Sequence, residues 1–189
     1  MPNLYLDIET SGLSITKDEV LIVGMLCDGH FKQYVKDNTL YQYDIDEFVF
    51  EHSPDYIVGY NNLRFDIPFL VQNKTIKCKS FNNFKQKDLM KICHQNNIYG
   101  GLKKTEQFFE IERSEEPLNY FQQKAVWKKW EEKGDFNSLN RFLRYNESDV
   151  RNLVLLEQKL EQKLEQKLDE KNNNINEIKK KRKIIIKNR

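Results

Sequence analysis

The chain has 189 residues, which suffices for one globular domain with a few dozen residues to spare. No apolar stretch is long enough to cross a bilayer, and the three cysteines are widely spaced, which argues against a membrane-spanning protein and against a disulfide scaffold. The net charge of +2 is uneven, because residues 171–189 carry +7 and the other 170 residues carry −5. An acidic body with a basic tail suits an enzyme whose site concentrates carboxylates and whose tail contacts phosphates, although a lysine-rich tail also keeps proteins in solution.

The start of the chain and its cysteines indicate the cellular compartment of the protein. A strand pattern begins at once, which leaves no room for a signal peptide. The odd number of cysteines, without a CxxC pair or zinc-type spacing, favours a reducing compartment. We therefore expect a soluble, intracellular, cytoplasmic protein that does not associate with membranes.

The first part of the sequence predicts three strands. Apolar and polar residues alternate over 4–9, which is the pattern of a half-buried first strand. Val20–Cys27 is apolar on both faces and therefore predicts a central strand. Asp28 and Gly29 form a hairpin signal, so His30–Val35 is expected to return antiparallel to it.

The rest of the chain mixes helical and strand patterns. We expect helices over 41–51, 87–95, 102–109, 122–133 and 137–156, a buried strand over Tyr56–Gly59, an apolar turn over 67–71 and a short edge strand within 75–84. The predicted fold is α/β, with a mixed central sheet flanked by helices, because the early hairpin excludes a simple doubly wound parallel sheet.

Composition changes after residue 156. We assign 1–156 to a globular domain and 157–170 to a charged helical extension with a leucine at every fourth position. The three asparagines at 172–174 are expected to break the helix. We therefore expect 171–189 to be a basic, disordered tail, or one ordered only on binding.

Asp7 and Glu9 lie two residues apart on the first predicted strand, so both side chains project to the same face. Neighbouring carboxylates repel each other unless something neutralises them. A divalent cation such as Mg²⁺ does so, and carboxylate oxygens are its preferred ligands. The pair therefore predicts a metal site or, alternatively, a solvated strand edge with two ordinary surface acids.

A third acid, Asp66, follows Phe65 in an apolar segment. An aspartate among large apolar groups needs a partner. Aspartate is also a preferred helix N-cap, and Pro68 fits the first turn of a helix. Both roles are compatible, because a residue that caps a helix can still reach a metal ion.

A fourth acid lies in the strongest predicted helix. Tyr145 and Asp149 are four residues apart there, so they share one face of the helix. The same face carries the apolar Phe142 and Val150, which predicts that it points towards the body of the protein. Taken alone, the pair is typical of a core tyrosine and a surface acid.

The order of three short motifs resembles the exonuclease motifs of the DEDD superfamily, whose fold is ribonuclease-H-like. The motifs are LDIET with Asp7 and Glu9, YNNLRFD with Asp66, and YNESD with Tyr145 and Asp149. One such motif arises easily by chance, whereas three in this order and spacing do not.

Details of the motifs indicate the branch and the relatives. The position five residues before Asp149, where the histidine branch has its histidine, is Arg144, whereas Tyr145 matches the tyrosine branch, DEDDy. The run GYNNLRFDIPF is similar to the proofreading domain of family B DNA polymerases, and residues 102–156 are similar to YprB-type ribonuclease-H-like domains. The resemblance covers about residues 1–156 and leaves no room for a polymerase palm, which favours a free-standing nuclease.

The resemblance implies a 3′→5′ exonuclease that hydrolyses phosphodiester bonds of single-stranded DNA or RNA with two Mg²⁺ or Mn²⁺ ions. It assigns Asp7, Glu9, Asp66 and Asp149 to the two ions, with Asp7 between them, and it assigns Tyr145 to orienting the attacking water.

The resemblance also predicts contacts with the substrate. Leu13 would wedge beside the terminal base, Phe65 would stack near the terminal nucleotide and Asn61 would bind substrate, unless Leu13 packs locally and Phe65 belongs to the core. The basic tail would contact phosphates. Two other functions on the same fold stay open, a catalytically inactive nucleic-acid-binding module and a structure-specific endonuclease.

Overall fold

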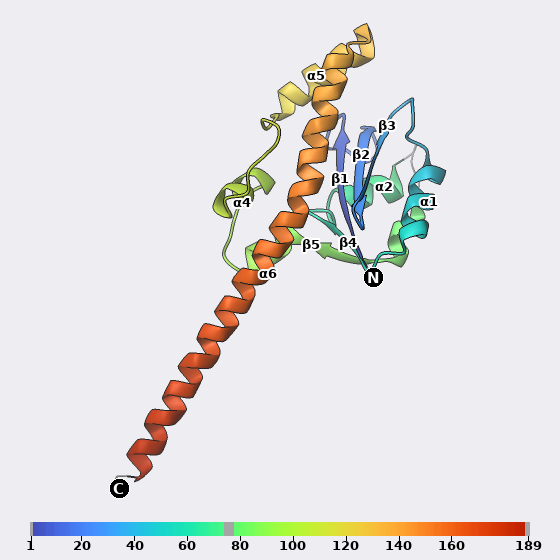
Figure 1. Ribbon diagram of the computed structural model, residues 1–189. Helices are drawn as coiled ribbons and strands as arrows, with labels where there is room; N and C mark the ends of the chain where they lie inside the picture. Colours follow the sequence, from blue (N-terminus) through green and yellow to red (C-terminus); the bar gives the residue numbers. More distant parts are fainter. Residues whose placement is uncertain (1, 74–77, 188–189) are drawn as a thin grey trace. The chain divides into compact units, whose positions relative to one another are not determined.

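The computed structural model describes residues 2–73 and 78–187, and within them five strands form one mixed sheet (Figure 1). The strands stand in the order β3-β2-β1-β4-β5. They are β1 (Asn3–Thr10), β2 (Val20–Cys27), β3 (His30–Val35), β4 (Tyr56–Gly59) and β5 (Lys85–Asp88). The pairs β1–β2 and β2–β3 are antiparallel, whereas β1–β4 and β4–β5 are parallel. The predicted α/β fold with a mixed sheet is confirmed.

The tight turn between β2 and β3 sets the antiparallel half of the sheet. Asp28 and Gly29 both have positive φ, 49° and 79°, which suits a two-residue hairpin turn whose twist matches that of the strands. β2 is buried along its whole length, because the sheet carries an apolar layer on each side. The predicted hairpin and the predicted internal strand are both confirmed.

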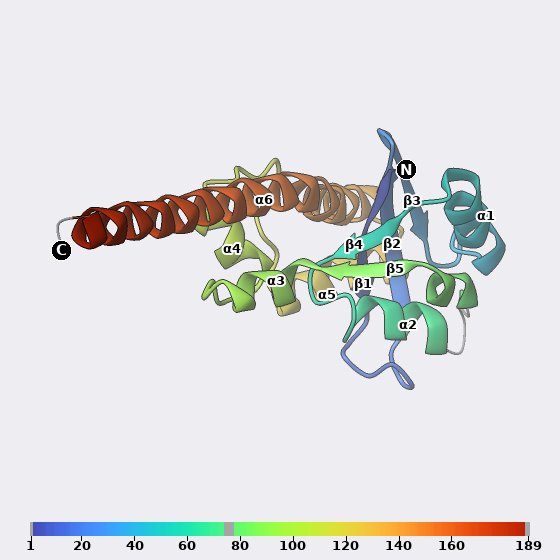
Figure 2. The same ribbon diagram turned by 90° about the horizontal axis from the view of Figure 1, so that it is seen from below.

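Helices cover both faces of the sheet (Figure 2). They are α1 (Gln42–His52), α2 (Asp66–Gln72), α3 (Leu89–Gln95), α4 (Leu102–Phe108), α5 (Tyr120–Lys133) and α6 (Phe136–Lys187). On one face, α1 and α2 pack against Leu4, Leu6 and Ile8 of β1. On the other face, α5 and the first part of α6 pack against β2 and β3 around Phe142.

The edge strand β5 is displaced from its predicted position. It lies at Lys85–Asp88, after the predicted range of 75–84 and within the start of the helix predicted over 87–95. Its residues are polar and it pairs through its backbone with β4, so no apolar alternation marks it in the sequence. The helix α3 begins only after β5, because the Asp88 side chain accepts hydrogen bonds from two backbone N–H groups of the first helical turn.

The chain between β4 and β5 is more helical than predicted. The apolar turn expected over 67–71 is the helix α2, whose Phe69 and Leu70 are buried in the core. Lys79–Asn83 forms a short 3-10 helix instead of a strand. Residues 75–77 of the predicted edge strand lie outside the described residues.

The chain divides into two compact units, Met1–Leu156 and Glu157–Arg189. In the second unit α6 continues to Lys187, through the asparagines at 172–174 where we predicted a break. Asparagine costs a helix only up to about 0.7 kcal/mol relative to alanine, and the neighbouring glutamate and lysine residues favour helix. Residues 188–189 lie outside the described residues, and the division into extension and basic tail stays a prediction. None of the described helices is long and apolar enough to span a membrane.

Candidate active site

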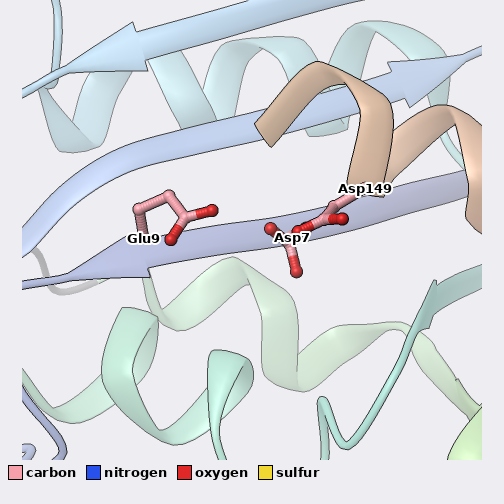
Figure 3. Close-up of side chains that lie close together, drawn as sticks. All are labelled: Asp7, Glu9 and Asp149. Carbon is pink, nitrogen blue, oxygen red and sulfur yellow. The ribbon is translucent and has the colours of Figure 1, made fainter. Parts of the chain in front are cut away.

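β1 and α6 bring three acidic side chains together (Figure 3). Asp7 and Glu9 project from the same face of β1, as their spacing requires, and Asp149 reaches them from α6. One carboxylate oxygen from each residue lies within 4.8 Å of the others. Oxygens gathered in this way can share a divalent cation, so the group could hold a metal ion.

A polar contact beside Asp7 joins α6 to the sheet. Asn146 donates from Nδ2 to Asp7 Oδ2 at 2.9 Å and to the Asp7 carbonyl at 3.3 Å. Its Oδ1 accepts a hydrogen bond of 2.9 Å from Gln33 of β3. Gly24, which pairs with Asp7 in the sheet, makes this approach possible, because a Cβ there would overlap the Asn146 side chain. The helix is therefore held close to the strand at the place where both contribute acids.

Asp66 lines the same pocket as the three acids from the start of α2. It is buried, and its Oδ1 accepts a hydrogen bond of 3.2 Å from the backbone N–H of Ile8. The N-cap of α2 is Phe65, so Asp66 is the first residue of the helix and the expected capping role is wrong. The bond to Ile8 ties the Asp66 carboxylate to the strand that carries Asp7 and Glu9.

Tyr145 is buried beside Asp149, one helical turn before it. Its ring lies against Phe142, and the Nζ atom of Lys103, a residue of α4, lies 4.7 Å from the centre of the Tyr145 ring. Burial, followed by the negative charges of Asp149 and Glu9, raises the pKa of the Tyr145 hydroxyl strongly. The hydroxyl therefore keeps its proton at neutral pH and acts as a hydrogen-bond donor towards Asp149.

The four acids share an electrostatic environment that disfavours their charges. Burial, and after it the neighbouring carboxylates, raise the pKa values of Asp7 and Glu9 well above the ordinary range. Burial raises the pKa of Asp66 to about 7. It also raises the pKa of Asp149, although Arg113 opposes the shift. A cluster of mutually repelling hard oxygen donors, of which Glu9, Asp66 and Asp149 are buried and Asp7 is half-buried, fits a divalent cation such as Mg²⁺ or Mn²⁺, which would relieve the repulsion.

A buried ion-pair network stands behind Asp149. Arg113 contacts Asp149 and also bonds both carboxylate oxygens of Glu106 at 2.6 and 2.7 Å. Glu106 is only 1% exposed, and Asn152 of α6 donates to it at 2.9 Å. This network therefore holds one carboxylate oxygen of Asp149 against Arg113.

The candidate catalytic pocket has a volume of about 220 Å³. Its lining includes the four acids, Tyr145 and all three residues predicted to contact substrate, which are Leu13, Asn61 and Phe65. Leu13 is 76% exposed, which leaves its side chain available to a ligand, whereas Phe65 is half-buried and packs against Phe69. Phe65 thus belongs in part to the core, and the contacts of Leu13, Asn61 and Phe65 with substrate stay predictions.

Several residues around the site escaped sequence analysis. Tyr120 and Gln123 of α5 line the pocket, and Glu106 and Arg113 support Asp149. A usable signal for the last two is a glutamate and an arginine that flank Phe108, Phe109 and Ile111. The positions of Tyr120 and Gln123 depend on how α5 packs, which no local pattern specifies.

A model of the RNase_H superfamily matches residues 4–161. Among curated proteins, none matches the chain. The family B DNA polymerase of the hyperthermophilic archaeon Pyrobaculum calidifontis aligns with 85% of the chain at a TM-score of 0.67 and 19% identity, and the chain spans only 24% of that polymerase.

Two further solved structures are similar over most of their length. A nuclease in its apo form has a TM-score of 0.59 and 19% identity, covering 87% of this chain and 74% of its own. NrnC of Brucella melitensis has a TM-score of 0.55 and 20% identity, with the same 87% and 74% coverage. At these identities the structures support the fold, whereas the family model spans the sheet and all the acids described above. On that match, the chain belongs to the RNase_H superfamily.

Proposed function

We propose that the protein is a metal-dependent 3′→5′ exonuclease of the tyrosine branch, acting on single-stranded nucleic acid. The observation that carries the proposal is the meeting of Asp7, Glu9 and Asp149 within 4.8 Å. Asp66 in the same pocket completes the four carboxylates that the DEDD motifs imply. Similar structures that are a nuclease and a DNA polymerase add support, since both kinds of protein act on nucleic acid.

The carboxylates would hold two Mg²⁺ or Mn²⁺ ions. Bound there, the ions would supply Lewis-acid stabilisation of charge on the phosphate and a more acidic water for attack. Asp66 is already oriented by the N–H of Ile8, and Asp149 by Arg113, so both present a carboxylate whose direction is fixed before any ligand binds.

The proposal gives Tyr145 a positioning role. A tyrosine hydroxyl is ordinarily protonated at neutral pH, so in that form Tyr145 cannot accept a proton from water as a general base. It can donate a hydrogen bond, and it stands beside Asp149 in the pocket. We therefore assign it the positioning of the attacking water or of a phosphate oxygen.

The direct test uses 5′-labelled single-stranded DNA and RNA oligonucleotides with Mg²⁺, Mn²⁺ or EDTA. We expect a ladder that shortens from the 3′ end with metal and no cleavage in EDTA. Asp7→Asn should slow cleavage by at least about a thousandfold, because it removes a charged ligand without changing the shape of the side chain. Its Tm should stay equal or rise, because one of several repelling charges is gone.

Asp28→Asn is the matched control, since it makes the same chemical change in the exposed hairpin turn. It should cleave like the wild type. A circular single-stranded DNA separates exonuclease from endonuclease, because only an endonuclease can open it. Binding without cleavage under every metal would replace the proposal with an inactive binding module, and Asp7→Asn with wild-type rates would refute the site.

A further inference from the structure

A second cleft lies between the loop that follows β4 and the helix α3. Its volume is about 630 Å³, within the range of about 300–1,000 Å³ typical of small-ligand sites. Its lining includes Leu63 and Arg64 from the loop, Asp88 at the end of β5, Lys91 and His94 of α3, and Tyr99 just after α3. These residues are distinct from those that line the catalytic pocket.

The chemistry of this cleft is cationic. The Arg64 and Lys91 side chains are exposed, and His94 adds ring nitrogens that can donate hydrogen bonds. Asp88 is the acid in the lining, but it is buried and its Oδ1 already accepts hydrogen bonds from three backbone N–H groups. The two fixed positive charges therefore determine which ligands the cleft attracts, and phosphate groups are the best match.

Tyr99 gives the cleft a flat apolar surface. Its side chain is 68% exposed, and its ring centre lies 5.4 Å from that of His94. The hydroxyl donates to Asn97 Oδ1 at 3.2 Å, which limits the directions the ring can take. An exposed aromatic ring beside basic side chains is the arrangement that proteins use to bind single strands, with bases stacked and phosphates paired.

The loop after β4 is a wall shared by the cleft and the catalytic pocket. Asn61 and Phe65 line the catalytic pocket, whereas Leu63 and Arg64, between them in sequence, line the cleft. The backbone N–H of Asn61 donates to Asp88 Oδ1 at 3.0 Å, so a wall of the catalytic pocket is bonded directly to a wall of the cleft. The cleft is therefore next to the catalytic pocket, on the other side of this loop.

We infer that the cleft binds an internal nucleotide of a single-stranded polynucleotide whose end occupies the catalytic pocket. Arg64 and Lys91 pair with backbone phosphates, and Tyr99 stacks a base. The placement of the strand's end rests on the proposed function, whereas the recognition of a single strand by the cleft does not. The chemistry is common to DNA and RNA, so both are tested.

The test measures binding in EDTA, which prevents cleavage, by fluorescence anisotropy with labelled ten-nucleotide DNA and RNA. Replacing both cations, with Arg64→Ala and Lys91→Ala in one variant, should raise Kd about tenfold or more and lower the salt dependence of log Kd by about one unit or more. Tyr99→Ala should raise Kd about fivefold or more, whereas Tyr99→Phe, which keeps the ring, should bind like the wild type.

The matched control removes two exposed positive charges elsewhere, with Lys128→Ala in α5 and Arg141→Ala in α6. Equal losses in both double variants would overturn the inference, because the effect would then be general electrostatics. Unchanged binding in the cleft variant would overturn it as well. The two proposals fail in different ways. A wild-type protein that binds through the cleft but never cleaves would refute only the proposed exonuclease activity. A wild-type protein that cleaves, with a cleft variant that binds normally, would refute only the proposed binding of a nucleotide in the cleft.

Discussion

The two faces of β1 carry opposite kinds of side chain. Leu4, Leu6 and Ile8 enter an apolar cluster with α1 and α2, whereas Asp7 and Glu9 meet Asp149 from α6. Burial of the apolar face stabilises the fold, whereas gathering carboxylates on the other face costs free energy until a cation neutralises them. One strand thus serves both stability and chemistry, and substitutions on its two faces should have effects that can be separated.

The largest effect on stability is expected at the charges behind the acidic face. Arg113→Ala should lower the free energy of unfolding by about 3–5 kcal/mol, because it leaves Glu106 buried without its cation. Adding Glu106→Gln should recover much of that loss, since it removes the uncompensated charge. Urea unfolding of the single and double variants measures both numbers. A loss below about 1 kcal/mol for Arg113→Ala would mean that the pair is open to water.

The apolar face should respond in stability alone. Leu6→Ala should lower the free energy of unfolding by about 2–5 kcal/mol, because a fully buried side chain leaves a cavity. Well below its Tm, the variant should keep wild-type nuclease rates, since Leu6 faces away from the acids. The pair Leu6→Ala and Asp7→Asn therefore gives opposite results in unfolding and in cleavage. A comparable loss of cleavage in both variants would show that the two faces are not independent.

The smallest expected effect is the dependence of the protein's stability on pH and on bound metal. Folding raises the pKa of Asp66 from 3.8 to about 7, so the folded protein binds this proton more tightly than the unfolded chain does. Without metal, the stability contributed by this proton is complete below pH 3.8 and is lost as the pH rises through about 7. Near pH 8, Mg²⁺ at about a hundred times its Kd should restore about 2.7 kcal/mol. Thermal unfolding between pH 4 and 8, with and without Mg²⁺, checks both statements. A metal-free Tm that climbs from pH 5 to 8 would contradict them.

Much of the site could be predicted because its parts are local. A spacing of two on a strand places Asp7 and Glu9 on one face, and a spacing of four on a helix does the same for Tyr145 and Asp149. The contact that joins these two halves of the site could not be predicted from the sequence, because it depends on Asn146 and on the absence of a side chain at Gly24. The Arg113–Asp149 pair spans 36 residues and has no periodic signal.

The elements of the fold also differ in whether local sequence patterns predict them. Strands with apolar patterns, β1 and β2, and the turn at Asp28 and Gly29 were predictable from local chemistry. β5 was misplaced because its pairing with β4 uses the backbone, which carries no sequence signal. The start of α5 was placed two residues late, because the prediction began the helix at Gln122, which is the third helical residue of the capping box that Asn119 opens.

The hydrogen bond between Asn146 and Asp7 spans 139 positions of the chain. During synthesis the first hairpin leaves the ribosome long before α6 exists, so Asp7 and Glu9 first face water on an open sheet. The nascent protein therefore cannot assemble the acidic group until nearly the whole first unit has emerged. Until then, the growing chain lacks the group of acids that could hold a metal ion.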